Sequence, residues 1–557
     1  MDRRLFLVSV VLAAAVTAPF LGKAFHADDP IVLAVCERTL RDPLRPHEGT
    51  LHWGGGRIPV GEAATHPPLL GYYLAPFVAV WGYSEPVLHA AMGLWLVVLA
   101  VGAGLLGRWF WAGPWWPMLF VVLSPLVVVS TNVMPQVPAA AMLTLGLALF
   151  VLGTDDERRG LLAGGSALVG LAAVTDYTAA AAVPLVALYP VLRGKGRYAL
   201  WAAVPLGILG AWCAHGAWAQ GEPHLVAVAR RRAAQLEARG LTWDGAAASR
   251  LTVVGSMVFL APALAVGWFR RRAWLGLPLL AAAGAASWVG VNAAFGAPGL
   301  VSRPEVAGGG TLSWQYGLWA VCGGMLLFAA LGGGLGAALW ALPKRRGEAA
   351  DWLLLVAWAA VGLAAAAWQA SPAFVVALVP LSVLGLRLVG SRRRPVVAAL
   401  GLMLAAQAAA AAVVALADRE RAEAWRAFAA YAERRYQRRD QEVWFAGHGG
   451  WHHYALREHG FQPLVADGLR PPAGAVLLEP ESVSRSRYPP GLGERLELVE
   501  EKASPASVPA RTADPLHCAF YAPDDYRMPY LLTFEPAPVA VGRVYRVGAA
   551  EATRPPE

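Results

Sequence analysis

The sequence predicts an α-helical polytopic membrane protein of about thirteen transmembrane helices, followed by a small C-terminal α/β soluble domain. Hydrophobic residues make up 57% of the 557 residues. Mean hydropathy is +0.46, and both values are too high for a soluble globular protein. Apolar runs of membrane-spanning length recur along most of the chain. After about residue 417 the composition changes abruptly to charged stretches and short apolar runs.

The charged and sulfur-containing residues exclude several other classes of protein. The net charge is +9, but the basic residues form short clusters between apolar runs. This pattern is typical of topology signals and excludes a nucleic-acid partner. The four cysteines lack the spacing of a zinc or redox motif. Cys36 and Cys518 are both predicted outside, so their compartment allows a disulfide between them.

The N-terminus begins the first predicted span. Met1-Asp2-Arg3-Arg4 precedes an apolar run that ends at Gly22. A signal peptide has the same basic start, but this run is long for one and lacks a clean cleavage site before Lys23. A retained first helix is therefore favoured. With either interpretation, the residues after Gly22 lie outside the cytoplasm.

The other apolar runs and the basic clusters between them predict the topology. Helices are expected at residues 5–22, 87–107, 114–131, 136–153, 160–175, 177–192, 198–218, 251–269, 273–295, 314–342, 351–368, 373–391 and 395–417. With this assignment almost every Lys/Arg cluster falls on the same, cytoplasmic side as Arg3 and Arg4. Residues 67–83 are short and contain Pro76, so we expect a juxtamembrane helix on the outer face.

One basic group breaks this pattern. Arg230, Arg231 and Arg232, with Arg239, fall in a predicted outer loop. They indicate either a solvated helix on the membrane surface, at residues 226–240, or a cationic lip that binds lipid phosphate.

Residues 1–417 are the predicted transmembrane domain, and residues 418–557 are the predicted soluble domain. Residues 418–440 are dense in charge and carry aromatic side chains at roughly helical spacing, which predicts an amphipathic connector helix. Strands of a small α/β domain are expected at the short apolar runs 443–446, 475–478 and 544–547. The odd number of spans places this domain outside, on the same face as the loop of residues 23–83.

The outer loop 23–83 carries polar residues that suit a reaction site at the membrane surface. Asp28 and Asp29 lie a few residues beyond the first span, where a partly desolvated carboxylate can act as a general base. An ordinary charged flank that ends the helix is the alternative. His66 precedes two prolines, and as a cation it would hold an anionic phosphate there. A His-Pro-Pro turn without function is the alternative.

Two further outer loops and one motif of the soluble domain carry candidate groups. The amides of Asn132 and Gln136 suit either sugar hydroxyls or interfacial capping. Arg303 and Glu305 lie in a Gly-rich loop that fits a phosphate and sugar lid or a plain linker. The three histidines within residues 448–453 lack an acidic or cysteine partner at ligand spacing, so metal binding is not favoured there.

Taken together, these motifs resemble the GT-C membrane glycosyltransferases that use polyprenyl-phosphate sugars. This superfamily includes the protein O-mannosyltransferases and the bacterial aminoarabinose transferase of lipid A. The matching residues cover roughly positions 1–200 in family order and are Asp28-Asp29, His66-Pro67-Pro68-Leu69 with Tyr72-Tyr73, Gly82-Tyr83-Ser84-Glu85 and Leu123-Ser124-Pro125-Leu126. The stretch Gly447-His448-Gly449-Gly450-Trp451 is similar to a Gly-His-Trp-Gly pattern in the C-terminal domains of some bacterial members.

The resemblance implies a GT-C-like catalytic domain in the membrane and assigns roles to the candidate residues. Asp28 would be the catalytic carboxylate, with Asp29 beside it as a second catalytic acid. His66 stands where some members have a Lys that contacts the donor phosphate, and Arg303 is expected to assist it. The expected substrate-binding residues are Tyr72, Asn132, Gln136 and Glu305. Many relatives have Asp at the place of Gln136.

The implied reaction is a single inverting displacement at the anomeric carbon, in which Asp28 takes the acceptor proton and His66 steadies the leaving phosphate. The expected partners are a polyprenyl-phosphate sugar donor, a lipid, glycan or protein acceptor, and membrane lipid. Family members differ in their use of a divalent metal, which stays open here, and no other cofactor is expected. The expected location is a bacterial inner membrane, with the N-terminus cytoplasmic and the C-terminal domain periplasmic.

Two other functions are alternatives to a transferase. A transporter or flippase of lipid-linked sugar would carry ionisable groups at mid-membrane and structurally related halves. The predicted spans here are almost free of charge. A catalytically inactive membrane scaffold is the third interpretation, and the departure at Gln136 is its main support.

Overall fold

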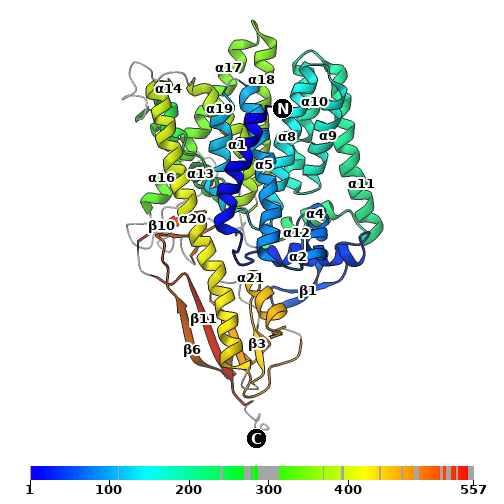
Figure 1. Ribbon diagram of the computed structural model, residues 1–557, viewed down its shortest axis with the longest axis vertical. Helices are drawn as coiled ribbons and strands as arrows, with labels where there is room; N and C mark the ends of the chain where they lie inside the picture. Colours follow the sequence, from blue (N-terminus) through cyan, green and yellow to red (C-terminus); the bar gives the residue numbers. More distant parts are fainter. Residues whose placement is uncertain are drawn as a thin grey trace.

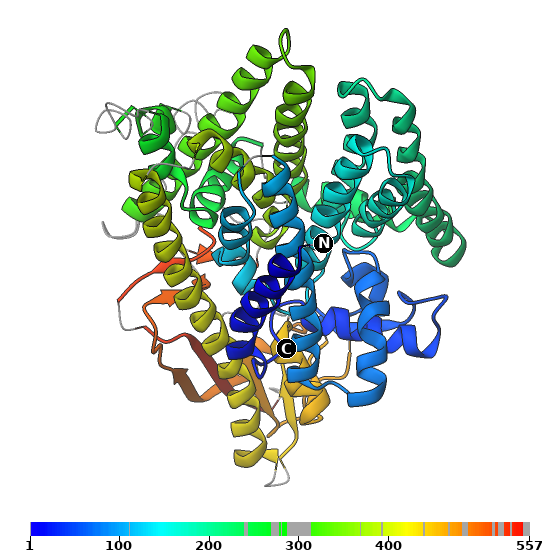
Figure 2. The same ribbon diagram turned by 45° about the horizontal axis from the view of Figure 1, so that its top comes forward.

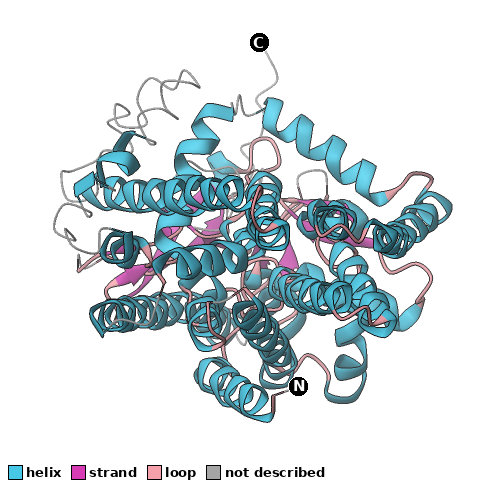
Figure 3. Ribbon diagram, turned by 90° about the horizontal axis from the view of Figure 1, so that it is seen from above, coloured by secondary structure: helices cyan, strands magenta, loops and turns pink. Residues whose placement is uncertain are grey.

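The computed structural model shows a bundle of helices with a small β-sheet at one end (Figure 1). It describes residues 2–110, 112–238, 243–268, 278–279, 281–286, 313–367, 369–390, 394–437, 441–465, 468–481, 488–514, 518–521, 528–534 and 537–549. The N-terminus lies on the side of the bundle away from the sheet (Figure 1). Viewed along the bundle, the helices pack side by side and the strands lie beneath them (Figure 3).

The helices of the bundle and its outer face follow one another in the chain with short connections. The first group is α1 (Arg3–Thr17), α2 (Asp29–Arg41), α3 (Val60–Ala63), α4 (Leu69–Trp81), α5 (Glu85–Trp109), α6 (Trp115–Val122), α7 (Pro125–Val129), α8 (Gln136–Asp155), α9 (Arg159–Ala173), α10 (Val183–Leu192), α11 (Ala203–Gln220) and α12 (His224–Ala238). The second group is α13 (Trp243–Met257), α14 (Ala261–Trp268), α16 (Ser313–Leu327), α17 (Gly333–Ala341), α18 (Arg346–Ala366), α19 (Val375–Val389) and α20 (Arg394–Arg435). Short 3₁₀ or π turns at 18–20, 177–182, 196–202, 328–332 and 371–374 extend several of them.

The bundle confirms the predicted helical polytopic fold. Within the described part of the chain, eight helices are long and apolar enough to cross a membrane. The predicted span 114–131 is broken into α6 and α7, because Ser124 caps α7 by accepting the Leu126 backbone N–H (3.2 Å). Most of the predicted span 273–295 lies outside the described residues.

Buried polar side chains satisfy the backbone where membrane helices break. The Ser124 hydroxyl donates to the carbonyl of Met257 at the end of α13 (2.7 Å). Gln407 of α20 donates to the carbonyl of Phe120 (2.7 Å) and accepts from the backbone N–H of Phe259 (3.0 Å). Lipid offers no hydrogen bonds, so these side chains replace the missing helix bonds.

The helix predicted at 67–83 is present as α4, which at 13 residues is shorter than a span. It packs closely on α2, since a Cβ atom on Gly71 would lie 2.6 Å from the Val35 side chain. Between α2 and α4, the hairpin of β1 (Thr50–Trp53) and β2 (Gly56–Pro59) and the short α3 complete this outer layer. The layer holds the loop residues around position 66 next to α2.

The surface helix predicted at 226–240 is present as α12. Its Arg231 donates to the carbonyl of Gly61 (3.0 Å), and its Arg230 pairs with Glu222 (2.9 Å). Both side chains therefore anchor α12 to its neighbours. Arg239 lies outside the described residues.

The C-terminal sheet is mixed and has the strand order β4-β3-β5-β11-β6. β3 runs parallel to β4 and β5, and β11 runs antiparallel to β5 and β6. The strands are β3 (Val443–Phe445), β4 (Gln462–Pro463), β5 (Val476–Pro480), β6 (Leu496–Ser504) and β11 (Ala540–Val547). They confirm the strands that the sequence predicts near 443, 475 and 544.

The connector predicted at 418–440 is continuous with the last membrane helix. The 42 residues of α20 run from the bundle down along the sheet (Figures 1 and 2). The Phe428 ring is buried, and a Cβ atom on Gly542 of β11 would lie only 2.5 Å from it. The division between residues 417 and 418 therefore falls inside one unbroken helix.

A second segment of the C-terminal part returns to the bundle. It contains the short strands β7 (Ala510–Arg511), β8 (Ala513–Asp514), β9 (Cys518–Ala519) and β10 (Leu531–Leu532). The Tyr530 hydroxyl donates to the carbonyl of Ser256 (2.8 Å), and the Gln315 side chain pairs with the backbone of Leu532. This segment brings polar side chains of the C-terminal part to the end of the membrane helices that faces the sheet.

Candidate active site

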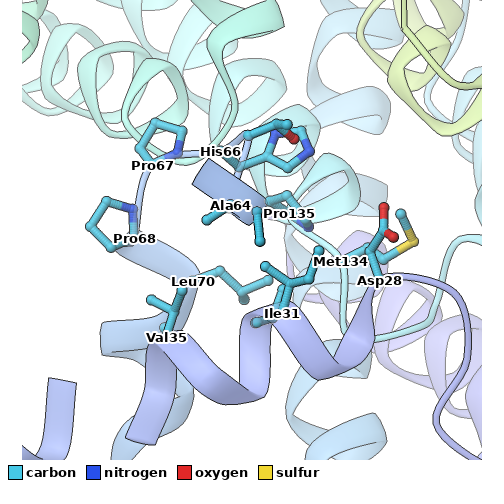
Figure 4. Close-up of a pocket in the computed structure, with 14 residues that line it drawn as sticks. Asp28, Ile31, Val35, Ala64, His66, Pro67, Pro68, Leu70, Met134 and Pro135 are labelled. Carbon is cyan, nitrogen blue, oxygen red and sulfur yellow. The ribbon is translucent and has the colours of Figure 1, made fainter. Parts of the chain in front are cut away.

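Asp28 and His66 both line a cavity between α2 and the loop around position 66 (Figure 4). It has a volume of 40 Å³, and its other lining residues are mainly apolar: Ile31, Val32, Val35, Ala63, Ala64, Thr65, Pro67, Pro68, Leu70, Gly71, Met134 and Pro135. Asp28 and His66 are its only ionisable lining residues. A space of this size holds a few water molecules, so a sugar would lie at its mouth. The sequence predicts this meeting of the two residues.

Asp28 immediately precedes α2 and follows a turn with unusual backbone geometry. Ala27 has a φ of +45°, in the left-handed region. The turn is closed by the backbone N–H of Asp29, which donates to the carbonyl of His26 (3.0 Å). The Asp28 carboxyl makes no hydrogen bond with any described residue and is exposed at the cavity. The surrounding protein raises its pKa, and charge on His66 opposes this shift.

Asp29, in contrast, is fully buried beneath the same turn. Its Oδ2 accepts the backbone N–H of His26 (2.7 Å), while its Oδ1 has no hydrogen-bond partner within the described structure. Burial raises the pKa of Asp29 to about 7, although the bond from His26 and the charge of Lys23 act in the opposite direction. Asp29 therefore titrates near neutral pH and has a free oxygen that can carry the proton.

The raised pKa of Asp29 predicts a pH-dependent effect of Asp29→Asn on stability. The native pKa of about 7 lies above the ordinary value of 3.8, so the folded protein binds the proton more tightly than the unfolded chain does. Asp29 then favours folding at low pH and disfavours it as the pH rises through 7. The destabilisation begins above pH 3.8 and is complete above about pH 7, so we expect Asn to raise the melting temperature much more at pH 8 than at pH 4, as measured by thermal unfolding in detergent. An equal change at both pH values would contradict this assignment.

His66 is held from two sides by buried groups. Its Nδ1 lies 3.6 Å from Oδ2 of Asp176, and its Nε2 lies 3.3 Å from the amide nitrogen of Gln136. The other oxygen of Asp176 accepts two hydrogen bonds from Thr178, each 2.8 Å long. At 3.6 Å the Asp176 carboxylate makes no hydrogen bond to the ring, but its charge favours the imidazole with a proton on Nδ1.

Asp176 is a site residue that the sequence analysis did not identify. It is the only acid between the predicted spans 160–175 and 177–192, and it is 1% exposed. A single acid at the junction of two apolar runs was the signal in the sequence from which this residue could have been found. Gln136 and Asp176 thus lie beside the same histidine, one at each ring nitrogen.

Behind the Asp28 turn lies a buried polar network centred on Asp418 of α20. Lys23 donates to Asp418 Oδ2 (2.5 Å) and to Asn132 Oδ1 (2.6 Å). Tyr521 donates to Asp418 Oδ2 (2.8 Å), and Thr512 donates to its Oδ1 (2.9 Å). The side chains of Lys23 and Asp418 are 3% and 0% exposed. The network joins the loop after α1 to the C-terminal part of the chain.

Asn132 and Tyr72, both expected to bind substrate, have protein partners in the structure. The amide of Asn132 is fully buried, accepts from Lys23 and donates to the Tyr521 hydroxyl (2.7 Å). The Tyr72 hydroxyl donates to the carbonyl of Pro43, and Tyr72 is absent from the cavity wall. Both side chains are placed to hold the outer layer together. Arg303 and Glu305 lie outside the described residues.

The cysteines and the histidine-rich stretch are also resolved. All four cysteines are free, so no disulfide joins Cys36 to Cys518. His448 packs on Trp53 with ring centroids 4.6 Å apart, and His453 packs on Phe25 at 4.8 Å. In the described ranges, no group of three or more His, Cys, Asp or Glu side chains is placed to hold a metal ion.

Comparison with solved structures returns matches to two proteins, an oligosaccharyltransferase and ArnT. The oligosaccharyltransferase of Archaeoglobus fulgidus, solved with a tethered acceptor peptide, is 13% identical, with a TM-score of 0.46 over 83% of this chain and 64% of that chain. ArnT from Cupriavidus metallidurans in the apo state is 14% identical, with a TM-score of 0.35 over 85% of this chain and 92% of that chain. ArnT bound to undecaprenyl phosphate is 13% identical, with a TM-score of 0.38 over the whole of both chains.

The chain thus spans about two thirds of the length of the oligosaccharyltransferase. No family model matches the sequence, and no curated protein matches it significantly.

Proposed function

We propose that this protein is a membrane glycosyltransferase that moves a sugar from a polyprenyl-phosphate donor to a lipid, glycan or protein acceptor, with inversion at the anomeric carbon. The observation that carries the proposal is the pairing of Asp28 and His66 on one cavity beside the membrane helices. A base for the acceptor and a group for the donor phosphate must lie within reach of one sugar carbon. The sequence resemblance supplies the donor class.

In the proposed reaction Asp28 acts as the general base. The acceptor oxygen or nitrogen forms a bond to the anomeric carbon as the bond from that carbon to the phosphate oxygen breaks, and the acceptor proton passes to Asp28. Two features of Asp28 support this role. Its carboxyl faces the cavity without a hydrogen-bond partner in the described structure, and its raised pKa makes it a stronger base than an ordinary aspartate.

His66, held by Asp176 and Gln136, would bind the leaving phosphate. A ring N–H of His66 would donate to a phosphate oxygen once the Nε2 atom gives up its contact with the Gln136 amide. Asp29, whose pKa is about 7, would stabilise the turn and serve as a proton reservoir beside Asp28. The apolar remainder of the cavity wall suits the first prenyl units of the carrier better than it suits a sugar.

The outer side of the membrane is the proposed location of the site. The basic clusters predicted to be cytoplasmic include the loops after α8 and α17, which lie at the end of the bundle away from the sheet (Figure 1). The cavity lies in the layer between the bundle and the sheet. A donor that is itself a membrane lipid would reach this level without leaving the bilayer.

A transfer assay tests the proposal. The wild-type protein and Asp28→Asn, each in native membranes at equal protein level, are given a panel of radiolabelled polyprenyl-phosphate sugars. We expect label to move into a lipid, glycan or protein fraction with the wild type only. If no donor on the panel is used by folded wild-type protein, the transferase proposal fails, and a flippase or a scaffold becomes the better interpretation.

A further inference from the structure

The turn that carries Asp28 is held by residues more than 400 positions further along the chain. Gly449 to Tyr454, here called the clamp, belongs to the C-terminal part and includes α21 (Gly450–His452). The motif analysis singled out this stretch, but the proposed reaction gives it no role. It touches the turn at backbone atoms of Phe25 and Ala27 and at the Phe25 ring.

Glycine is required at the closest point of this contact. A Cβ atom on Gly450 would lie 2.1 Å from the carbonyl oxygen of Phe25 and 2.8 Å from the Cα of His26. A Cβ atom on Gly449, whose φ is +76°, would lie 3.3 Å from the carbonyl oxygen of Ala27. Backbone atoms cannot rotate away as a flexible side chain can, so any larger residue at Gly450 must displace the turn.

Directed hydrogen bonds accompany the close packing. The backbone N–H of Phe25 donates to the Tyr454 hydroxyl (2.6 Å), which itself donates to Glu85 of α5. The Phe25 ring packs against His453 with ring centroids 4.8 Å apart. Trp451, at the centre of the clamp, is fully buried and donates to the carbonyl of Ala446 (2.9 Å). The clamp is therefore rigidly fixed to the sheet on one side and to the turn on the other.

The turn needs such support because of its backbone conformation. Ala27 has a φ of +45°, which is unfavourable for a residue with a Cβ atom and persists only where the surroundings determine it. If the contacts with the clamp were loosened, Ala27 would relax to a common conformation. Asp28, the next residue, would then turn away from the cavity and from His66.

We propose that the clamp is a positioning element of the active site, in which Gly450 and Tyr454 hold the turn so that Asp28 points into the cavity. The proposal rests on the proposed function for its catalytic consequence. It makes the C-terminal part a component of the catalytic unit, in addition to any contact it has with an acceptor.

Gly450→Ala in the full-length protein tests the proposal kinetically. We expect kcat to fall by about 10²-fold, as for a catalytic group misplaced by about 1 Å, with little change in KM for the donor. Gly493→Ala is the matched control, because a Cβ atom there would meet only the Tyr488 ring, at 3.9 Å. Wild-type kcat in Gly450→Ala would overturn the proposal.

A double variant separates positioning of Asp28 from general damage. If Gly450 acts through Asp28, adding Gly450→Ala to Asp28→Asn leaves the residual transfer rate unchanged, because the group being positioned is already lost. A further fall by the same factor as in the wild-type background would show that the effect is merely structural and would overturn the proposal.

Hydrogen exchange tests the clamp without relying on activity. Tyr454→Phe removes only the hydroxyl that accepts from Phe25, so we expect the Phe25 amide to exchange about tenfold faster while amides of the sheet are unaffected. Unchanged exchange would overturn the clamp even if the transferase function is correct. Faster exchange in a protein that transfers no sugar would leave the clamp intact and remove only the proposed function.

Discussion

Asp28→Asn is expected to lower the rate of sugar transfer by about 10²- to 10⁴-fold, the usual contribution of a general base. The amide has nearly the same shape as the carboxyl but cannot accept the acceptor proton. The carboxyl of Asp28 has no hydrogen-bond partner in the described structure. Because the raised pKa of Asp28 means that its charge disfavours the folded state, replacing it should not lower the melting temperature. Single-turnover transfer in nanodiscs measures the chemical step directly.

Two further variants serve as controls. One changes an acid outside the site, and the other tests whether His66 and not Asp28 is the base. Asp42→Asn changes an acid at the other end of α2, where the side chain only accepts the backbone N–H of Leu44 (2.9 Å), and should retain full activity. His66→Ala should weaken donor binding and slow transfer while leaving some base catalysis. If His66→Ala abolished transfer and Asp28→Asn did not, the base would be the histidine that faces Asp176.

Lys23→Met is expected to lower the free energy of unfolding by about 3–5 kcal/mol, because it leaves the buried carboxylate of Asp418 without its cation. The two side chains are almost completely buried and 2.5 Å apart. Methionine has a similar length, so the loss would come from charge and hydrogen bonding and not from an empty volume. Thermal unfolding followed by size-exclusion chromatography in detergent measures the change.

The matched control is an exposed ion pair of the same outer layer. Arg45 lies 3.3 Å from Glu48, with both side chains about half exposed, and Arg45→Met should cost less than about 1 kcal/mol. The double variant Lys23→Met with Asp418→Asn should recover much of the stability, since no buried charge is then left unpaired. An equally small loss in Lys23→Met and Arg45→Met would show that the buried pair is unimportant for stability.

The sequence alone is sufficient to predict those site residues and elements that can be recognised from their near neighbours in the chain. Asp28 follows the end of the first apolar run, His66 precedes the short helix predicted at 67–83, and the predicted parity of the spans would place both outside. The helical character of 418–440 and three of the strands also follow from short-range patterns. Each of these depends only on neighbouring residues and on the side of the membrane.

Partners that come from distant parts of the chain could not be predicted in this way. The sequence analysis treats Asp418 as the first charged residue of a connector, but it forms the centre of a buried network with Lys23 and Tyr521. Asn132 has the composition of a sugar ligand, and only the fold shows that both ends of its amide are occupied. Such pairings depend on how helices cross, which no periodicity encodes.

The Lys23–Asp418 pair also bears on how the protein is made. Its members are 395 positions apart, one directly after the first membrane helix and the other in the last. During synthesis Lys23 leaves the translocation machinery long before Asp418 exists. Until the last helix is made, Lys23, which lies next to the Asp28 turn beside the bilayer, lacks its carboxylate partner. A working site would thus form only after the last membrane helix has been made, and a chain whose synthesis stalls before that helix would lack the carboxylate that neutralises Lys23.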